Sequence, residues 1–158
     1  MGSIKLATMP ESPIVQKSWA ELTTSELYDF LKLRTDVFFV EQRIDEEELD
    51  NRDQAPTTQH LWIADDLGTA AYLRIIHDDE PQLHDATTTF GRVVVRSDRR
   101  GERLAQRLIE RVLEQVGSAP MYLHAQAYVA PLYARYGFVA EGAEYLEAGL
   151  VHVNMYRS

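Results

Sequence analysis

The stretch from residue 90 to residue 106, FGRVVVRSDRRGERLAQ, constrains the fold most, because a β-strand pattern changes there to a helical one across an arginine-rich turn. The β-branched run Val93, Val94 and Val95 favours a buried strand. From Gly101 onward apolar residues recur at helical spacing, namely Leu104, Leu108, Ile109, Val112, Leu113 and Val116. A strand, a turn and a helix are therefore expected in direct succession.

The turn before this helix concentrates positive charge. Five arginines lie between positions 96 and 107 against two acids, Asp98 and Glu102, so the local net charge is +3 in a chain whose total is −9. A helix start also leaves main-chain N–H groups without partners, which favours bound anions. The turn therefore predicts a site for one small polyanion.

Length and composition exclude several classes of protein. The chain has 158 residues, 45% of them hydrophobic, which suits one globular domain at 14–158 after a flexible lead-in at 1–13. It has no apolar run of about 18 residues and no secretory signal, so we expect a cytoplasmic protein without a membrane partner. The absence of cysteine excludes disulfides and a cysteine nucleophile. A pI near 5.0 argues against nucleic-acid binding.

Periodicity predicts a mixed α/β order for the rest of the chain. Strands are expected at 14–19, 60–64, 70–76, 87–95, 121–125, 138–145 and 150–156. Helices are expected from about Ser25, where Thr23 and Glu26 form a capping box, at 101–116, and around Pro131. Residues 37–40 predict a second short helix or the end of a bent one.

An acidic segment runs from Glu41 to Asp53. It contains seven acids and two arginines, a net charge of −5, without a periodic apolar pattern, and it predicts a loop. Two interpretations remain open: a solvated surface loop, or a negatively charged loop that attracts a cationic substrate.

Four segments together resemble the GCN5-related N-acetyltransferase (GNAT) superfamily, and most closely its ElaA-like branch. They are RTDVFFVEQ from Arg34, VVVRSDRRGERLA from Val93, QAYVAPLYARYGF from Gln126 and EAGLVHVNM from Glu147. The resemblance implies a single-domain α/β fold, with a mixed sheet of six or seven strands splayed between the fourth and fifth and about four flanking helices. It also implies acetyl-CoA as cosubstrate, bound in the cleft between those strands.

The resemblance assigns the cofactor-binding residues. The fourth strand, with Val93, Val94 and Val95, would pair with the pantetheine arm, and Gln126 at the end of the fifth would contact the cofactor. The pyrophosphate motif of the superfamily falls on Arg100, Gly101, Glu102, Arg103, Leu104 and Ala105. Arg103 replaces a usual glycine, whose lack of a side chain allows close approach of phosphate, so Arg103 either turns outward or contacts a phosphate itself.

Tyr133 occupies the place of the superfamily's frequent general acid. A phenol can donate a proton or hydrogen bond to the leaving thiolate. The attacking amine must be neutral, and the candidates for its base are Glu41, His124, His60 and His152. The histidines show no metal-binding spacing, so no metal is expected.

The resemblance implies an N-acetyltransferase that acts on a primary amine of a small molecule or peptide, by direct attack in a ternary complex. The acidic loop favours a cationic acceptor, and a homodimer is possible. Two alternatives remain: a CoA-binding regulatory or interaction module without turnover, which the replacement at Arg103 keeps open, and an acyltransferase like the acyl-homoserine-lactone synthases, which the segment from Arg34 also resembles.

Overall fold

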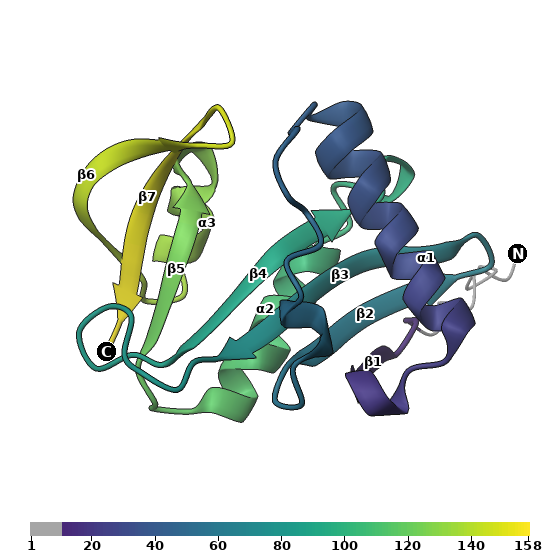
Figure 1. Cartoon of the computed structure of the whole chain (residues 1–158), viewed down its shortest axis with the longest axis horizontal. Helices are drawn as coiled ribbons and strands as arrows, with labels where there is room; N and C mark the ends of the chain where they lie inside the picture. The colour runs from purple at the N-terminus through teal and green to yellow at the C-terminus, as the bar shows by residue number, and fades with distance from the viewer. Residues whose placement is uncertain (1–10) are drawn as a thin grey trace, which may run out of the picture.

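The computed structural model describes residues 11–158 as a seven-stranded sheet with helices on both faces (Figure 1). The first ten positions of the expected lead-in lie outside the described residues. The strands are β1 (Ile14–Ser18), β2 (Gln59–Asp65), β3 (Gly68–His77), β4 (Thr88–Val95), β5 (Met121–Gln126), β6 (Val139–Glu147) and β7 (Leu150–Arg157). The α-helices are α1 (Thr24–Arg34), α2 (Leu104–Val116) and α3 (Ala130–Ala134).

The sheet divides into two halves between β4 and β5. Its order is β1-β2-β3-β4-β5-β7-β6, and β4 and β5 form the parallel pair among otherwise antiparallel neighbours. Their pairing is limited to Thr88 with Met121 and Thr89 with Tyr122. Beyond these two positions the strands diverge (Figure 1). The expected splay between the fourth and fifth strands is therefore confirmed.

Alternating side chains in the central strands bury both faces of the sheet. On β2, Leu61 and Ile63 belong to the larger core, which α2 covers, whereas Trp62 belongs to a second core with Phe30 of α1. Period-two alternation directs neighbouring side chains to opposite faces. The two helices therefore stabilise the sheet from opposite sides, as Figure 1 also shows.

Helix α1 begins at the expected capping box, in which Thr23 and Glu26 bond each other's main-chain N–H groups. The helix continues into a π-helical segment, Thr35–Glu41. Residues 37–40 therefore form the extension of one helix, which was one of the two alternatives expected. π-Helical turns are rare and often lie at functional sites; this one ends beside the arginine-rich turn.

Two tight hairpins connect neighbouring strands. Asp65 pairs with Gly68 across a two-residue turn between β2 and β3, and Glu147 pairs with Leu150 across Ala148 and Gly149.

None of the helices in residues 11–158 is long and apolar enough to cross a membrane.

Candidate active site

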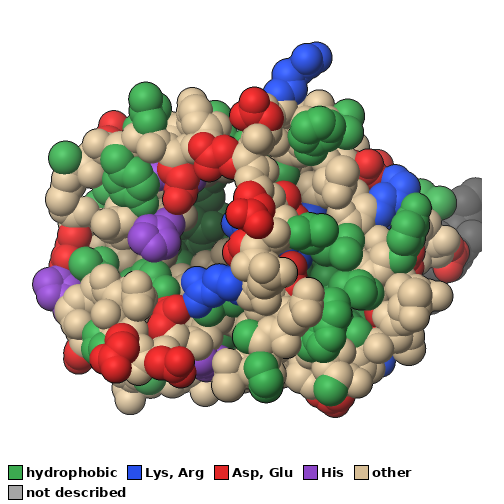
Figure 2. All heavy atoms as spheres, in the orientation of Figure 1, with side chains coloured by type: hydrophobic (Ala, Val, Ile, Leu, Met, Phe, Trp, Pro, Cys, Tyr) green, Lys and Arg blue, Asp and Glu red, His purple; other side chains and the backbone are tan. Residues whose placement is uncertain are grey.

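The splay opens a cavity of about 540 Å³ between the two halves of the sheet. Its walls come from β4, from β5 and β7, from α3, and from the acidic loop after α1. Figure 2 shows the hollow, with histidine, acidic and basic side chains around its rim. Ligand sites in proteins are typically concave and of this size, so this cleft is the candidate active site.

Strand β4 presents a free edge to the cleft. No strand within residues 11–158 pairs with its β5-facing side beyond Thr89. A β-bulge interrupts its other side, because Arg92 and Val93 together oppose Leu73, and Arg92 takes a φ of +53°. A Cβ placed on Gly91 would meet no atom within 4 Å. The edge therefore has both the main-chain groups and the room to receive an extended amide chain.

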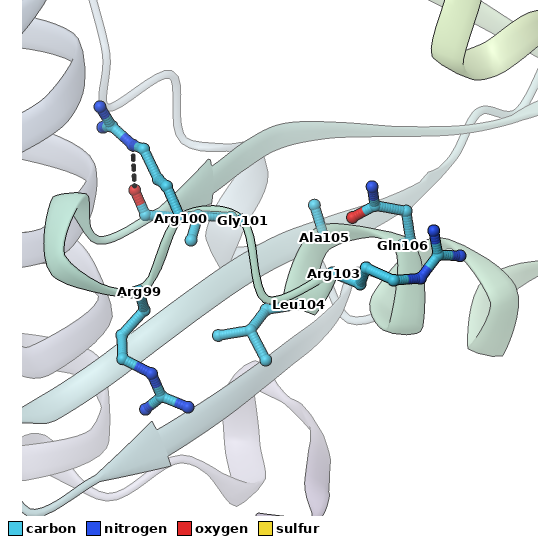
Figure 3. A pocket seen from close by; sticks show the side chains of 8 residues that line it. Arg99, Arg100, Gly101, Arg103, Leu104, Ala105 and Gln106 are labelled. Atoms are coloured by element: carbon cyan, nitrogen blue, oxygen red, sulfur yellow. Dashed lines mark hydrogen bonds between the residues drawn. The ribbon is translucent and has the colours of Figure 1, made fainter.

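The start of α2 forms a second, smaller hollow of about 150 Å³ (Figure 3). Gly101 has a φ of +85°, and Arg103, the N-cap residue, has a φ of +61° and caps no main-chain N–H with its side chain. The first helical bond of α2 runs from the Arg107 N–H to the Arg103 carbonyl, so the preceding N–H groups lack helical partners. This terminus is therefore suited to an anion.

Arg103 occupies the usual glycine position by adopting the left-handed conformation that glycine favours. Its side chain is 66% exposed and lies 3.8 Å from the Glu110 carboxylate. In Figure 3, Arg103 and Arg100 extend in opposite directions, with Gly101 between them. The Arg103 side chain thus extends towards Glu110 of α2, and the residue also lines the hollow.

Acids from other elements neutralise much of the basic turn. Asp65 pairs with Arg96 at 2.5 Å and with Arg99 at 2.6 Å. Arg100 donates to both carboxylate oxygens of Glu41, at 2.7 and 2.5 Å. This hydrogen bonding, together with the positive charge of Arg100, lowers the pKa of Glu41.

Tyr133 lies in the wall of the cleft. Its side chain packs edge-on against Phe90 and Phe138, with ring centroids 5.8 and 6.4 Å away. Burial raises its pKa to about 12. Within residues 11–158 no group hydrogen bonds to its hydroxyl, although the residue is only 8% exposed. The structure thus brings a protonated phenol to the cleft with its donor unused.

The other expected residues of the second half lie nearby. Gln126 and His124 of β5 both line the cavity. The Nδ1 of His124 lies 2.9 Å from Asn154 Oδ1 and 3.0 Å from the Tyr145 hydroxyl, and its ring is exposed. His60, by contrast, lies outside the cleft in the core under α1, where it stacks on Phe30 and burial lowers its pKa.

Several acids of the acidic loop form ion pairs with buried arginines of other elements, which neither interpretation of the sequence anticipated. Arg34, fully buried, donates to Asp53 at 2.8 Å and to Glu48 at 2.9 Å. Arg74 of β3 pairs with the same Asp53 at 3.0 Å and with Asp50 at 2.5 Å. Burial alone would raise the pKa of Asp53, but hydrogen bonds and the charge of Arg34 and Arg74 outweigh it and lower the pKa. The network fixes the loop over the cleft.

Three acids at the mouth of the cavity keep most of their charge uncompensated. Glu46 accepts the Ala148 N–H at 3.1 Å, which joins the loop to the β6–β7 turn. Glu47 has no ion-pair or hydrogen-bond partner within the described residues, and Glu147 lies 3.5 Å from the ring of His152. All three line the cavity. They make its mouth negative.

Gln42 and Tyr122 are among the cleft residues that sequence reasoning missed. The Oε1 atom of Gln42 is buried at the cavity without a hydrogen-bond partner in the described part of the chain. Tyr122 lines the same cavity and donates to Asp78. The alternating pattern of the strand predicts that Tyr122 is buried, but it does not show that the side chain lines this cleft. Nothing in the sequence around Gln42 indicates a role in the cleft.

The cleft fits an acyl-CoA. A free strand edge beside open space suits the amides of pantetheine, and the α2 terminus suits a pyrophosphate. Residues 24–158 match the family described as "Acetyltransferase (GNAT) domain". The chain therefore belongs to the GNAT acetyltransferase family.

Within that family the chain belongs to the ElaA-like branch. It is 35% identical to "Protein ElaA" of Escherichia coli over 87% of this chain and 91% of that protein. The crystal structure of E. coli ElaA superposes with a TM-score of 0.83 at 31% identity, covering 92% of this chain and 99% of that one.

Two further solved structures are similar. An acyl-CoA N-acyltransferase from Pseudomonas aeruginosa has a TM-score of 0.83 at 40% identity, over 93% of this chain and 99% of that one. A CoA-dependent acyl-homoserine lactone synthase has a TM-score of 0.73 at 19% identity, over 92% and 82%. The second likeness is one of fold alone.

Proposed function

We propose that the protein is an acetyl-CoA-dependent N-acetyltransferase that acetylates a primary amine by direct attack in a ternary complex. The observation that carries this proposal is one cleft lined by both the free edge of β4 and the unused Tyr133 hydroxyl. The catalytic domain is residues 14–158. The cysteine-free sequence supports a reducing compartment such as the cytoplasm.

In the proposed complex the main chain of Val93, Val94 and Val95 pairs with pantetheine. The N–H groups at the start of α2 and the charge of Arg100 bind the pyrophosphate, because a helix N-terminus favours anions. Gln126, at the end of β5, contacts the cofactor from the opposite wall. No side-chain cap or acidic residue in the first turn of α2 competes for this place.

Tyr133 stabilises the leaving group. Its pKa of about 12 exceeds that of a thiol, about 8.5, so complete proton transfer to the thiolate would be uphill by about 5 kcal/mol. A hydrogen bond to the developing thiolate avoids the cost of proton transfer, because the proton stays on the tyrosine oxygen. It stabilises the transition state by about 1.5–3 kcal/mol. The amine nitrogen, which must lose its protons as the amide forms, supplies the proton of the thiol.

The acceptor is an amine that carries positive charge beyond the reacting nitrogen. Glu46, Glu47 and Glu147 surround the mouth of the cavity, and the arginines of the acidic loop network pair with other carboxylates. A negative rim attracts and orients cations. The buried Oε1 of Gln42, which has no hydrogen-bond partner among residues 11–158, adds an acceptor.

A panel of amines tests this function. Purified protein with acetyl-CoA should release CoA in the presence of spermidine or a lysine peptide, and mass spectrometry should detect the acetylated amine. Glutamate should react at least about tenfold more slowly, because its carboxylates oppose the rim. Glu47→Gln should reduce this preference, whereas Glu114→Gln on the outer face of α2 should not. Acetyl-CoA binding without CoA release from any amine would favour a binding module.

Homodimer formation is part of the proposal, with β6 as the interface. This strand is an edge of the sheet, and Val139 and Leu146 are 65% and 74% exposed. Exposed strand edges are prone to pair with another chain. Sedimentation of the wild type against Leu146→Lys tests this point, since an unchanged monomer in both would contradict it.

A further inference from the structure

His152 lies where the acceptor half of the cleft meets the β6–β7 hairpin. On β7 it stands opposite Gln126 of β5 and opposite Tyr145 of β6. Its ring stacks on Tyr145 with a centroid separation of 5.9 Å, and the residue is only 7% exposed. It lines the same cavity as Tyr133. A titratable ring is thus held in the cleft on the wall that carries Gln126.

A main-chain contact determines which ring nitrogen carries the proton. The Nδ1 of His152 lies 2.8 Å from the carbonyl oxygen of Leu150. A carbonyl only accepts hydrogen bonds, so Nδ1 must be the donor. In the neutral ring Nε2 then holds the lone pair and is available as a proton acceptor.

A carboxylate lies beside the same nitrogen. Oε2 of Glu147 lies 3.5 Å from Nε2 of His152. The Leu150 carbonyl on one side of the ring and the Glu147 carboxylate on the other thus orient the imidazole.

We propose that Nε2 of His152 is the general base that takes a proton from the acceptor ammonium, an assignment that rests on the proposed acetyltransferase function. The neutral nitrogen then bonds to the thioester carbon while the carbon–sulfur bond breaks. The ammonium loses two protons. His152 takes one and releases it to solvent, and the other is transferred to the thiol of CoA. The products are the amide, CoA and one released proton.

The other candidate bases lack this combination of features. Both ring nitrogens of His60 are bonded in the core, one to the Tyr72 hydroxyl at 2.7 Å and one to the Asp53 carbonyl at 3.0 Å. Glu41 is held by Arg100. The ring of His124 is exposed and has no ion-pair partner among residues 11–158.

Asparagine replacements separate basicity from structure. In His152→Asn the side-chain amide can still donate to the Leu150 carbonyl, as Nδ1 does, but it has no basic nitrogen. Turnover with acetyl-CoA and spermidine should fall at least about 100-fold, the usual loss for a missing general base, while acetyl-CoA binding by calorimetry stays unchanged. His84→Asn, outside the cleft, should turn over like the wild type.

Each result decides a different point. Wild-type-like turnover of His152→Asn would overturn the assignment and leave the acetyltransferase function intact. If His124→Asn lost turnover and His152→Asn kept it, the general base would be His124. A wild type without turnover on any amine would overturn the proposed function and this assignment with it.

Two further measurements apply if the asparagine variant folds poorly. Added imidazole should restore turnover to His152→Ala, and an absence of rescue in a folded His152→Ala protein would contradict the role. In alkaline buffer, nitrogen-15 spectra of the histidine rings should show His152 protonated at Nδ1. A proton on Nε2 instead would overturn the assignment without any assay of activity.

Discussion

Arg100 and Glu41, 59 residues apart in the sequence, form a two-pronged ion pair that joins the arginine-rich turn to the end of the π-helical segment. The pair connects two residues that the sequence analysis assigned to different tasks, cofactor binding and catalysis. It leaves the Glu41 carboxylate directed at Arg100.

Glu41→Gln tests what this pair does. The pKa of Glu41 is lowered by Arg100, so this carboxylate is a poor base, and turnover should change by less than about threefold. Binding of acetyl-CoA should strengthen, because Arg100 loses a competing anion. Glu114→Gln, which removes a similar exposed charge beside Arg111, is the matched control. A 100-fold loss of turnover would restore Glu41 as the base.

Tyr133→Phe removes the unused donor from the cleft. Turnover should fall about 10- to 100-fold, as expected for one hydrogen bond to a developing charge. Calorimetry should show unchanged acetyl-CoA binding. The control is Tyr136→Phe, whose hydroxyl bonds to Glu110 at the surface. Equal turnover in wild type and Tyr133→Phe would remove the tyrosine from the mechanism.

Two replacements of Arg103 separate its conformation from its charge. Arg103→Gly should raise the free energy of unfolding by about 0.5–1 kcal/mol, because glycine adopts a φ of this sign without strain. Arg103→Ala should not, since it keeps the strained conformation. Chemical unfolding measures both. Acetyl-CoA binding weakened more than about tenfold in both variants would instead indicate a charged phosphate contact.

Arg34 stabilises the acidic loop from inside the protein. Arg34→Met removes the buried hydrogen bonds to Glu48 and leaves Asp53 with Arg74 as its remaining arginine, which should cost about 3 kcal/mol of unfolding free energy. Lys32→Met is the matched control on the same helix. Its ion pair with Asp36 is exposed, so the cost should stay below about 1 kcal/mol. Equal effects of the two changes would argue against a structural network.

The same network predicts a loss of stability in acid. The pKa values of Asp50 and Asp53 are lowered in the folded protein, whereas an unfolded aspartate titrates near 3.9. Their contribution is therefore complete above that pH and is lost as the pH falls through the folded values. Urea unfolding at about pH 6 and pH 3 measures it, and Arg34→Met should show a shallower decline. A free energy of unfolding that is the same at about pH 6 and pH 3 would contradict this role of Asp50 and Asp53.

The local pattern predicted most elements but not their contacts. The change of period after Val95 located β4 and α2, yet α2 begins at Leu104 rather than near Gly101, because Gly101 and Arg103 both take positive φ values. Positive φ values at single residues leave no periodic pattern in the sequence. The splay of the sheet followed from the family resemblance, since nothing in the residues alone indicates where two parallel strands stop pairing.

The acidic loop shows why charge runs are hard to interpret from sequence. Its partners Arg34 and Arg74 come from a helix and from a central strand. A signal was present, because Arg74 interrupts the apolar run AAYLRII and a buried charge needs a partner. The partner's identity depends on the fold, so only the structure divides the loop into paired acids and the free rim of the cavity.

The position of acetyl-CoA on the folded protein, measured by changes in amide NMR signals during titration, tests the proposed site most directly. We predict that the largest changes fall on Val93, Val94 and Val95 of β4 and on Leu104 and Ala105 at the start of α2. Changes confined to other surfaces, or none at saturating acetyl-CoA, would contradict it.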